Sequence, residues 1–212
     1  MLLALDTASP TVAVGLYDGT TVLADLVSDQ PMRHGEALAP LIEQALRIAG
    51  VDRGELSGIA VGVGPGPFTG LRVGLVTART LALALGVPVH GVCSLDVLAL
   101  EAAATGAVSG DFAVATDARR KEVYLASYDT SGRRTSGPVV DRPAALAAEL
   151  PDGCVVVGEG ADLYPEAFPH TAGPRRPSGA WLARAVSDDR VGVVEPAPLY
   201  LRRPDAQMPH AT

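Results

Sequence analysis

An internal repeat constrains the fold of this 212-residue chain more than any other feature. The segment ALDTASPTVAVGLYD (4–18) aligns without a gap on ATDARRKEVYLASYD (115–129), and five of the fifteen aligned residues are identical. In both copies a short apolar run ends in an acid, and a second run of β-forming residues follows after a turn. This pattern is typical of two consecutive strands, so the repeat predicts two lobes built on one strand–turn–strand unit.

The first half of the chain adds helices to this unit. Apolar spacing and turn residues predict five strands and three helices, with the strands at 2–6, 11–18, 21–27, 59–63 and 87–92 and the helices at 33–49, 70–85 and 94–104. This order resembles that of ribonuclease H-like folds, and two tandem lobes of this order resemble the actin-like ATPases. We therefore expect an α/β fold of this kind, with mixed β-sheets flanked by helices.

The expected division of the chain puts the first lobe at residues 1–106 and the second at 107–212. The second lobe is reduced, because after its first two strands it holds one further short strand (155–157) and a few weak helical patterns. These helical patterns lie near 142–149, 160–168 and 178–188. The proline-rich tail that follows is expected to be irregular.

The composition excludes several classes of protein. The net charge is −7, from 17 basic and 24 acidic residues, so the chain is a poor candidate for gripping nucleic acid by itself. No apolar run approaches the roughly 18 residues of a membrane span. The N-terminus MLLALD has no basic start and does not resemble a signal peptide. We therefore expect a cytoplasmic protein with no membrane contact.

An ATPase of this fold needs two loops whose backbone amides reach phosphate, with glycine where a Cβ would block the approach. Each loop follows the first strand of a lobe. Here the first loop holds Asp6 and Thr7 but has Ala8 where glycine is needed, and the second runs from Asp117 through residues 118–120, Ala-Arg-Arg, without any glycine. We interpret Asp6, Thr7 and Asp117 as vestigial nucleotide-loop positions and expect no bound cofactor.

Metal chemistry is not indicated either. The four histidines, at positions 34, 90, 170 and 210, are far apart in sequence, and the two cysteines form no CxxC pair. A ribonuclease H nuclease needs several converging carboxylates, and the strand that ends at Val63 offers only Gly62 and Gly64 at the required place. We expect no metal site and no catalytic residue.

The stretch GVGPGPFTGLRVGL (62–75) resembles a phosphate loop, but it lacks the Lys-Ser/Thr pair and the GxGxxG spacing. In the helix that follows, small residues recur every four positions and form one stripe, made of Gly70, Gly74, Ala78 and Ala82. Such a stripe lets another helix approach closely. That neighbour is either an internal helix of the same lobe or a helix of a partner chain.

The blocks MLLALDTAS, RHGEALAPLIEQAL, GVGPGPFTGLRVGL, ATDARRKEVYLASYD and PLYLR together resemble the TsaB (YeaZ) family, in this order and across nearly the whole chain. The resemblance implies a two-lobed actin-like fold and a role in making threonylcarbamoyladenosine, a modified base next to the anticodon of tRNAs that read codons beginning with A. It implies a non-catalytic scaffold that forms a heterodimer with its catalytic paralogue TsaD, is joined by the ATPase TsaE, and also self-associates. tRNA would be bound only as part of the complex.

The paralogue carries a metal-binding HxxxH after a segment like VPVHGV, and the matching positions here are Ser94 and Leu98, which cannot replace histidine ligands. The resemblance further implies that the first two helices of the first lobe, 33–49 and 70–85, form the interface with the partner. The implied interface residues are His34, Leu38, Leu41, Ile42, Gly70, Leu71, Gly74, Leu75, Ala78 and Ala82. The alternative function is a weak ATPase or a peptidase-like enzyme of the same superfamily.

Overall fold

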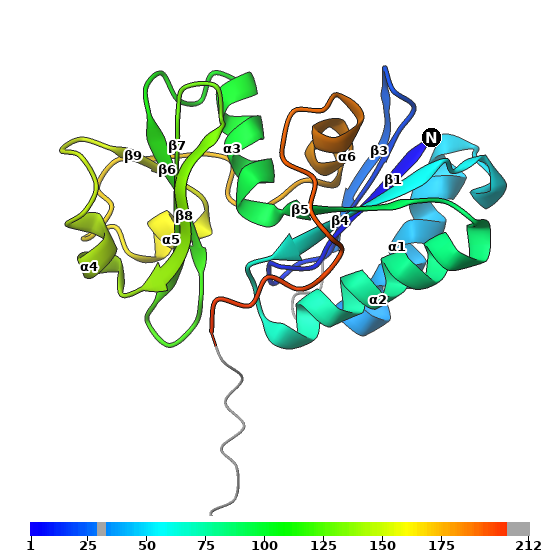
Figure 1. Ribbon diagram of the computed structural model, residues 1–212, viewed down its shortest axis with the longest axis horizontal. Helices are drawn as coiled ribbons and strands as arrows, with labels where there is room; N and C mark the ends of the chain where they lie inside the picture. The colour runs from blue at the N-terminus through cyan, green and yellow to red at the C-terminus, as the bar shows by residue number, and fades with distance from the viewer. Residues whose placement is uncertain (29–32, 203–212) are drawn as a thin grey trace, which may run out of the picture.

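The computed structural model describes residues 1–28 and 33–202, and the last ten residues of the expected tail lie outside that range. The chain forms two lobes side by side, each built on a five-stranded mixed sheet (Figure 1). The first sheet has the order β3-β2-β1-β4-β5. Its strands are β1 (Leu2–Asp6), β2 (Ala13–Tyr17), β3 (Val22–Val27), β4 (Gly58–Gly64) and β5 (Val89–Cys93).

The β1–β2 and β2–β3 pairs are antiparallel, whereas the β1–β4 and β4–β5 pairs are parallel. The alternation along β1 puts Leu3 and Leu5 on one face of the sheet and Leu2 and Ala4 on the other. Leu3 and Leu5 belong to the core under α1 (His34–Ala49) and α2 (Phe68–Leu85). Ala4 instead packs in the core under α6 (Gly179–Ser187), on the other face. Figure 1 shows α6 on the opposite side of the sheet from α1 and α2.

The second sheet has the order β10-β9-β6-β7-β8. Its strands are β6 (Phe112–Asp117), β7 (Val123–Tyr128), β8 (Arg134–Asp141), β9 (Val155–Val157) and β10 (Thr171–Ala172). The β6–β7 pair is antiparallel like β1–β2, and β6 pairs in parallel with β9 as β1 does with β4. The two copies of the sequence repeat therefore occupy equivalent places, which confirms the predicted fold.

Short helices complete this lobe, namely α4 (Pro143–Ala147) and α5 (Glu159–Leu163), and a single turn of 3₁₀ helix, η1 (Arg53–Glu55), precedes β4 in the first lobe. The structure adds two strands that the sequence did not predict, β8 and the two-residue β10, which lie at opposite edges of the second sheet. Of these, β8 is largely exposed. This lobe is smaller in helix content than the first, as expected for a reduced lobe.

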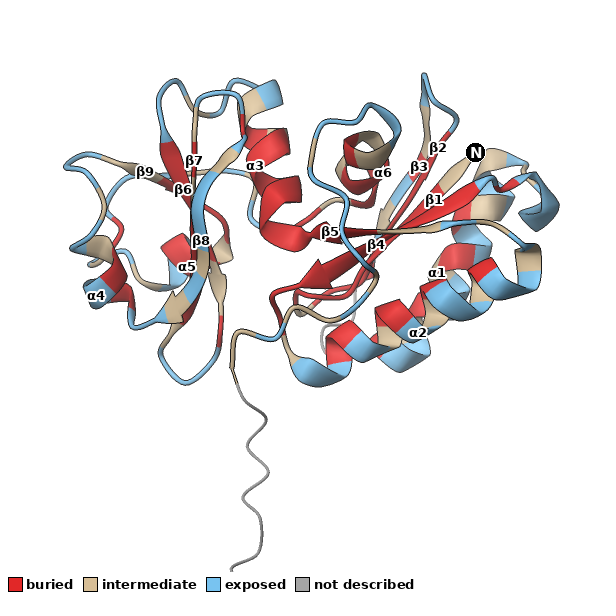
Figure 2. Ribbon diagram, viewed as in Figure 1, coloured by how far each residue is buried: buried red, intermediate tan, exposed pale blue. Residues whose placement is uncertain are grey.

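The lobes are joined by α3 (Ser94–Ala104), which is buried on nearly every side (Figure 2). Leu95, Leu98 and Ala99 pack in one apolar cluster with Phe112 and other residues of the second sheet. At the same junction Tyr128 donates a hydrogen bond of 2.8 Å to the Asp96 carboxylate, and the Arg134 guanidinium lies 3.4 Å from the other oxygen of Asp96. A helix buried all round fits its uniformly apolar sequence.

After the second sheet the chain returns to the first lobe, where α6 packs on β1 and β2. The expected division, which assigned residues 107–212 to the second lobe, is therefore wrong for α6. The Ser178 hydroxyl caps α6 by accepting from the Trp181 amide at 3.2 Å, and it donates to Asp25 of β3 at 3.0 Å. The backbones of Gly15 and Gly179 touch, since a Cβ on either glycine would meet the main chain of the other. Residues 179–187 therefore belong to the first lobe because only close glycine packing lets α6 sit on β2.

Candidate functional site

The loop after β1 closes on itself around Asp6. This carboxyl is buried; its Oδ1 accepts from the Ala8 amide at 2.8 Å and its Oδ2 from the Ser94 hydroxyl at 2.6 Å. Burial raises the pKa of Asp6, while the hydrogen bonds from Ser94 and Ala8 act in the opposite direction. A Cβ on Gly62 would run into the same carboxyl group. The acid thus has protein partners on both oxygens and acts as an internal brace for the loop.

Thr7 also contacts the protein interior. Its hydroxyl donates to the carbonyl of Gly70 at 2.8 Å, and both groups are buried. A Cβ on Gly74 would collide with the Thr7 side chain, and one on Gly70 would press on the Thr7 carbonyl oxygen. Thr7 therefore fixes the first two turns of α2 against the sheet.

The loop after β6 carries side chains where a phosphate loop would carry glycine. The Asp117 carboxylate accepts from the Arg119 amide at 2.8 Å and pairs with the Arg119 guanidinium at 3.1 Å. Arg119, Arg120 and Lys121 have φ values of +62°, +56° and +62°, a left-handed backbone that favours glycine. Long charged side chains therefore stand on this turn where a phosphate loop would carry glycine.

The loop after β6 faces a cavity of about 410 Å³ between the lobes, opposite the residues that lead into α2. Phe68 lies on one wall, Arg119, Arg120 and Tyr124 on the other, and Tyr200 of the C-terminal segment closes it. Among the described residues, no group of three or more His, Cys, Asp or Glu side chains is placed to hold a metal ion. The residues that line the cavity offer cationic and aromatic groups, and the three vestigial positions are not among them.

The small-residue stripe of α2 packs inside its own lobe, so the partner-chain interpretation of the stripe is wrong. The buried side of α2 consists of Gly70, Leu71, Gly74, Leu75, Ala78 and Ala82. These residues lie against β4 and β1 and around Thr7, and they share one core with the sheet. The stripe therefore allows a close approach, as expected, but the segments that approach it are Thr7 and the sheet of the same lobe.

The predicted interface residues of α1 face the same core. His34, Leu38 and Ile42 are buried, and Leu41 is partly buried against that core. The His34 ring lies at the first turn of α1, with Nε2 2.8 Å from the carbonyl oxygen of Ser9. His34 therefore joins α1 to the β1–β2 loop. The side chains of His34, Leu38 and Ile42 are unavailable to a partner in this conformation, whereas Leu41 is partly exposed.

The opposite side of α2 exposes apolar side chains that sequence reasoning missed. Val76 is 62% exposed and Leu83, two turns further on, is 86% exposed. Ile48 near the end of α1 is 56% exposed. We call Ile48, Val76 and Leu83 the exposed helical residues. The signal was present in the sequence, since positions 76 and 83 lie seven residues apart on the side away from the stripe.

Two further observations distinguish this side of α2. By length and composition α2 is the one helix, among the residues that the structure describes, that is long and apolar enough to cross a membrane. Its buried stripe nevertheless packs on the sheet, which assigns it to the lobe. A groove of about 700 Å³ runs past Leu83, lined also by Arg79, Val87 and Pro196. Exposed apolar residues beside such a groove are typical of protein–protein contacts.

Comparisons with known proteins agree with this architecture. The family described as "TsaD: tRNA N6-adenosine threonylcarbamoyltransferase" matches residues 22–170 of the chain. An uncharacterized protein of Mycobacterium tuberculosis is 42% identical over 97% of this chain and 93% of its own length. The Bacillus subtilis tRNA threonylcarbamoyladenosine biosynthesis protein TsaB is 33% identical over 69% of this chain, an alignment that spans 62% of that protein.

Solved structures show the same relationship. YeaZ from Pseudomonas aeruginosa superposes with a TM-score of 0.79 at 32% identity, covering 94% of this chain and 99% of that one. The activator of the 2-hydroxyisocaproyl-CoA dehydratase from Clostridium difficile shares the fold alone, with a TM-score of 0.54 at 10% identity over 89% and 95% of the two chains. The chain has the actin-like two-lobed fold and belongs to the TsaB (YeaZ) family, which takes part in tRNA threonylcarbamoyladenosine biosynthesis.

Proposed function

We propose that this protein is a non-catalytic scaffold subunit for threonylcarbamoyladenosine modification of tRNAs that read codons beginning with A. In this proposal it forms a heterodimer with a catalytic paralogue of the TsaD type and recruits an ATPase of the TsaE type. The complex acts in the cytoplasm, and tRNA is bound only by the assembled complex. A second copy of the chain is the competing occupant of the same surface.

The observation that carries the proposal is a contrast between two parts of the first lobe. The loop after β1 is closed by bonds within the chain, with Asp6 held by Ser94 and Ala8. The second loop has left-handed arginines in place of glycine. The outer side of α2, by contrast, exposes Val76 and Leu83 to solvent. A chain that has closed its nucleotide loops and keeps an apolar helix face is better suited to docking than to catalysis.

The proposed docking surface consists of the exposed helical residues Ile48, Val76 and Leu83, which replace the buried positions expected from sequence. These three side chains are apolar and exposed, and Leu83 lines the groove together with the charged Arg79. This is the usual anatomy of a protein interface, with apolar contacts inside and charged groups around them. The conformation of the first lobe needs no change to present them.

Depletion of the protein in its own cells, followed by quantification of threonylcarbamoyladenosine in total tRNA by mass spectrometry, tests the proposal. Expression of the wild-type chain should restore the modification. The double variant Val76→Glu/Leu83→Glu should not restore it, because two carboxylates would have to be buried in the interface. The variant Asp6→Asn, which preserves the shape of the closed loop, should restore it.

Three outcomes would contradict the proposal. Full restoration by Val76→Glu/Leu83→Glu would remove the docking surface from α2. A folded Asp6→Asn protein that binds the paralogue normally but restores no modification would indicate a chemical role for the carboxylate. Unchanged threonylcarbamoyladenosine after complete depletion would exclude the pathway itself.

A further inference from the structure

The C-terminal segment crosses the gap between the two lobes. After α6 the chain turns back and runs along the open edge of the first sheet, and its last described residues lie between the lobes (Figure 1). We call residues 191–202 the strap. The strap follows α6, which packs on the first lobe. The last residues of the strap nevertheless contact the second lobe, so the strap connects the two lobes.

The first part of the strap binds the edge of the first sheet. Gly91 of β5 and Val194 exchange two backbone hydrogen bonds, of 3.1 Å and 2.8 Å. Further along, the Leu199 amide donates to the carbonyl of Val63, at the end of β4, at 2.8 Å. A Cβ on Gly91 would meet the carbonyls of Val194 and Glu195 at 2.7 Å each, so the strap lies directly on the strand. This part of the strap is therefore an element of the first lobe.

The next residue, Tyr200, rests on the start of α2. Its ring stacks on Phe68 with centroids 5.1 Å apart and an angle of 23° between the planes. The Arg72 guanidinium lies 3.8 Å from the centre of the Phe68 ring, and Arg72 Nε donates to the Tyr200 hydroxyl at 3.3 Å. Ring stacking and a cation over an aromatic face each add stability beyond the buried area. Tyr200 is thus attached to the start of α2 through its contacts with Phe68 and Arg72.

The last described residue, Arg202, reaches the second lobe. It donates to the carbonyl of Ala118 at 2.9 Å, and its guanidinium pairs with the carboxylate of Glu122. These two residues frame the left-handed turn at residues 119–121. Arg202 is half-buried, so the pair is less screened by solvent than a surface ion pair. Leu201 packs beside it in the apolar cluster of α3 and the second sheet.

We propose that the strap is a latch: it holds the two lobes at one angle by tying the start of α2 to the turn at residues 118–122. A second part of the proposal is that the latch couples docking on α2 to the lobe angle. The first part stands on contacts within this chain. The second part rests on the proposed function, because it assumes that the partner binds α2.

The physical argument is that the contacts of the strap lie in series along one short segment. Leu199 is fixed to β4, and only three residues later Arg202 is fixed to the second lobe. A connection of this length can extend only slightly. The second lobe therefore cannot rotate away from the first without breaking the Arg202 contacts or separating Tyr200 from Phe68. An interface of a few such contacts has two discrete states, closed and open.

Spin-label distance measurements on the full-length chain test the latch. Labels are attached at Glu43→Cys in α1 and Glu149→Cys in the second lobe, both exposed positions, in a chain with Cys93→Ala and Cys154→Ser. The wild-type strap should give one narrow distance distribution. The double variant Tyr200→Ala/Arg202→Ala should broaden it and add a displaced second component.

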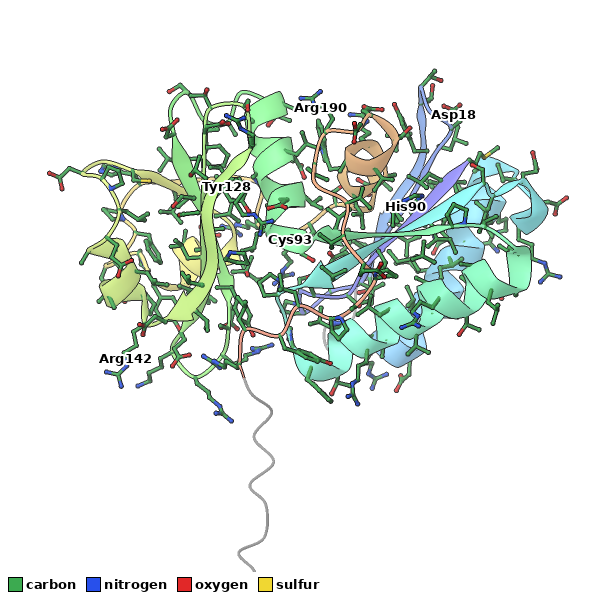
Figure 3. All side chains as sticks on the ribbon, viewed as in Figure 1. Asp18, His90, Cys93, Tyr128, Arg142 and Arg190 are labelled. Atoms are coloured by element: carbon green, nitrogen blue, oxygen red, sulfur yellow. The ribbon has the colours of Figure 1, made fainter. Side chains whose placement is uncertain are left out.

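The matched control is Arg190→Ala, which removes one arginine just before the strap. Arg190 lies at the upper edge of the molecule in Figure 3, and its backbone amide donates to the carbonyl of Ala185 in α6 at 3.0 Å. The control should leave the distribution unchanged. Circular dichroism establishes that each variant is folded, and if the double variant unfolds, Arg202→Lys, which loses the fork geometry but keeps the charge, takes its place. A distribution that superimposes on that of the wild type in a folded strap variant would overturn the latch.

Titration with a TsaD-type paralogue tests the coupling. In the strap variant the open form should predominate and bind the paralogue poorly, so the variant should bind it about tenfold more weakly than the wild type does. Adding the paralogue should also narrow the distance distribution of the variant. Wild-type affinity in a variant whose lobes have opened would overturn the coupling. Failure of the wild-type chain to bind the paralogue would instead refute the proposed function and leave the latch, measured on the isolated chain, standing.

Discussion

The Ser94 hydroxyl donates a 2.6 Å hydrogen bond to Oδ2 of Asp6, across the 88 residues that separate them in the chain. Ser94 stands where the resemblance to TsaD would require the first histidine of a metal-binding pair. Asp6 stands where an ATPase of this fold would hold its first loop acid. One contact thus joins the two positions, and it holds the end of β1 against the start of α3.

Substitution of the small-residue stripe should destabilise the folded chain. Gly74→Leu would drive a side chain into Thr7, and overpacking of this kind costs about 1–3 kcal/mol of unfolding free energy. For a chain of this size the melting temperature should fall by roughly 2–12 °C. The matched control Ala84→Leu, on the exposed side of the same helix, should melt close to the wild type. Equal melting temperatures with weakened partner binding only in Gly74→Leu would restore the partner interpretation of the stripe.

The small-residue stripe of α2 packs against a neighbour that its sequence pattern does not identify. The sequence predicted a close crossing at Gly70 and Gly74, and the structure has one, but the neighbour is the β1–β2 loop of the same chain. A stripe of small residues reports how near a neighbour comes and carries no information about which chain it belongs to. The exposed positions Val76 and Leu83 followed from the helical period alone once the stripe had been assigned to the core.

The two thiols should differ in reactivity. Burial raises the pKa of Cys93 to about 12, with the nearby Asp96 charge adding to the effect, so at neutral pH the thiolate is essentially absent. Cys93 lies at the junction of the lobes near Tyr128 (Figure 3). Cys154 is only partly buried. A thiol-specific chromogenic reagent should therefore react with one thiol in the native chain and with both after denaturation.

The variant Cys154→Ser is the control for that assignment. It should show almost no reaction in the native state and one thiol in denaturant. Rapid labelling of the native Cys154→Ser protein would mean that the junction around α3 opens far more readily than its burial indicates.

Glu101 of α3 should make stability depend on pH. Burial, and secondarily the negative charge of Asp25, raise the pKa of Glu101 to about 7 from 4.5, and its Oε2 is buried with no hydrogen-bond partner among the described residues. The unfolded chain ionises first, so stability is lost as the pH rises from 4.5 to about 7. Because the side chain is only half-buried, the loss is about 1 kcal/mol after allowance for solvent screening.

Glu101→Gln removes this penalty. In urea denaturation at about pH 8 the variant should be more stable than the wild type by about 1 kcal/mol, and the advantage should shrink at about pH 5. Glu149→Gln, at an exposed position, should show no such pH-dependent gain. The same advantage at both pH values would mean that packing, and not the carboxyl group's ionisation, sets the difference.

The repeat and the first lobe were predictable because their signals are local. Alternating apolar residues fix the β1–β2 and β6–β7 hairpins, and the apolar period fixes α1 and α2. β8 was missed because its residues are mostly exposed and include Gly137 and Pro138, which read as a turn. The return of α6 was missed for another reason. It depends on the contact of Gly15 with Gly179, and no local pattern reports which sheet a helix will cover.

A binding titration between the purified chain and a TsaD-type paralogue from the same cells tests the central claim most directly. We predict a one-to-one complex, an affinity reduced at least about tenfold in Val76→Glu/Leu83→Glu, and unchanged thermal unfolding of that exposed-surface variant. The control Asp52→Ala/Glu149→Ala, which alters two exposed residues off α1 and α2, should bind like the wild type. Absence of a complex, or wild-type affinity in the folded Val76→Glu/Leu83→Glu variant, would contradict a scaffold that docks through the exposed side of α2.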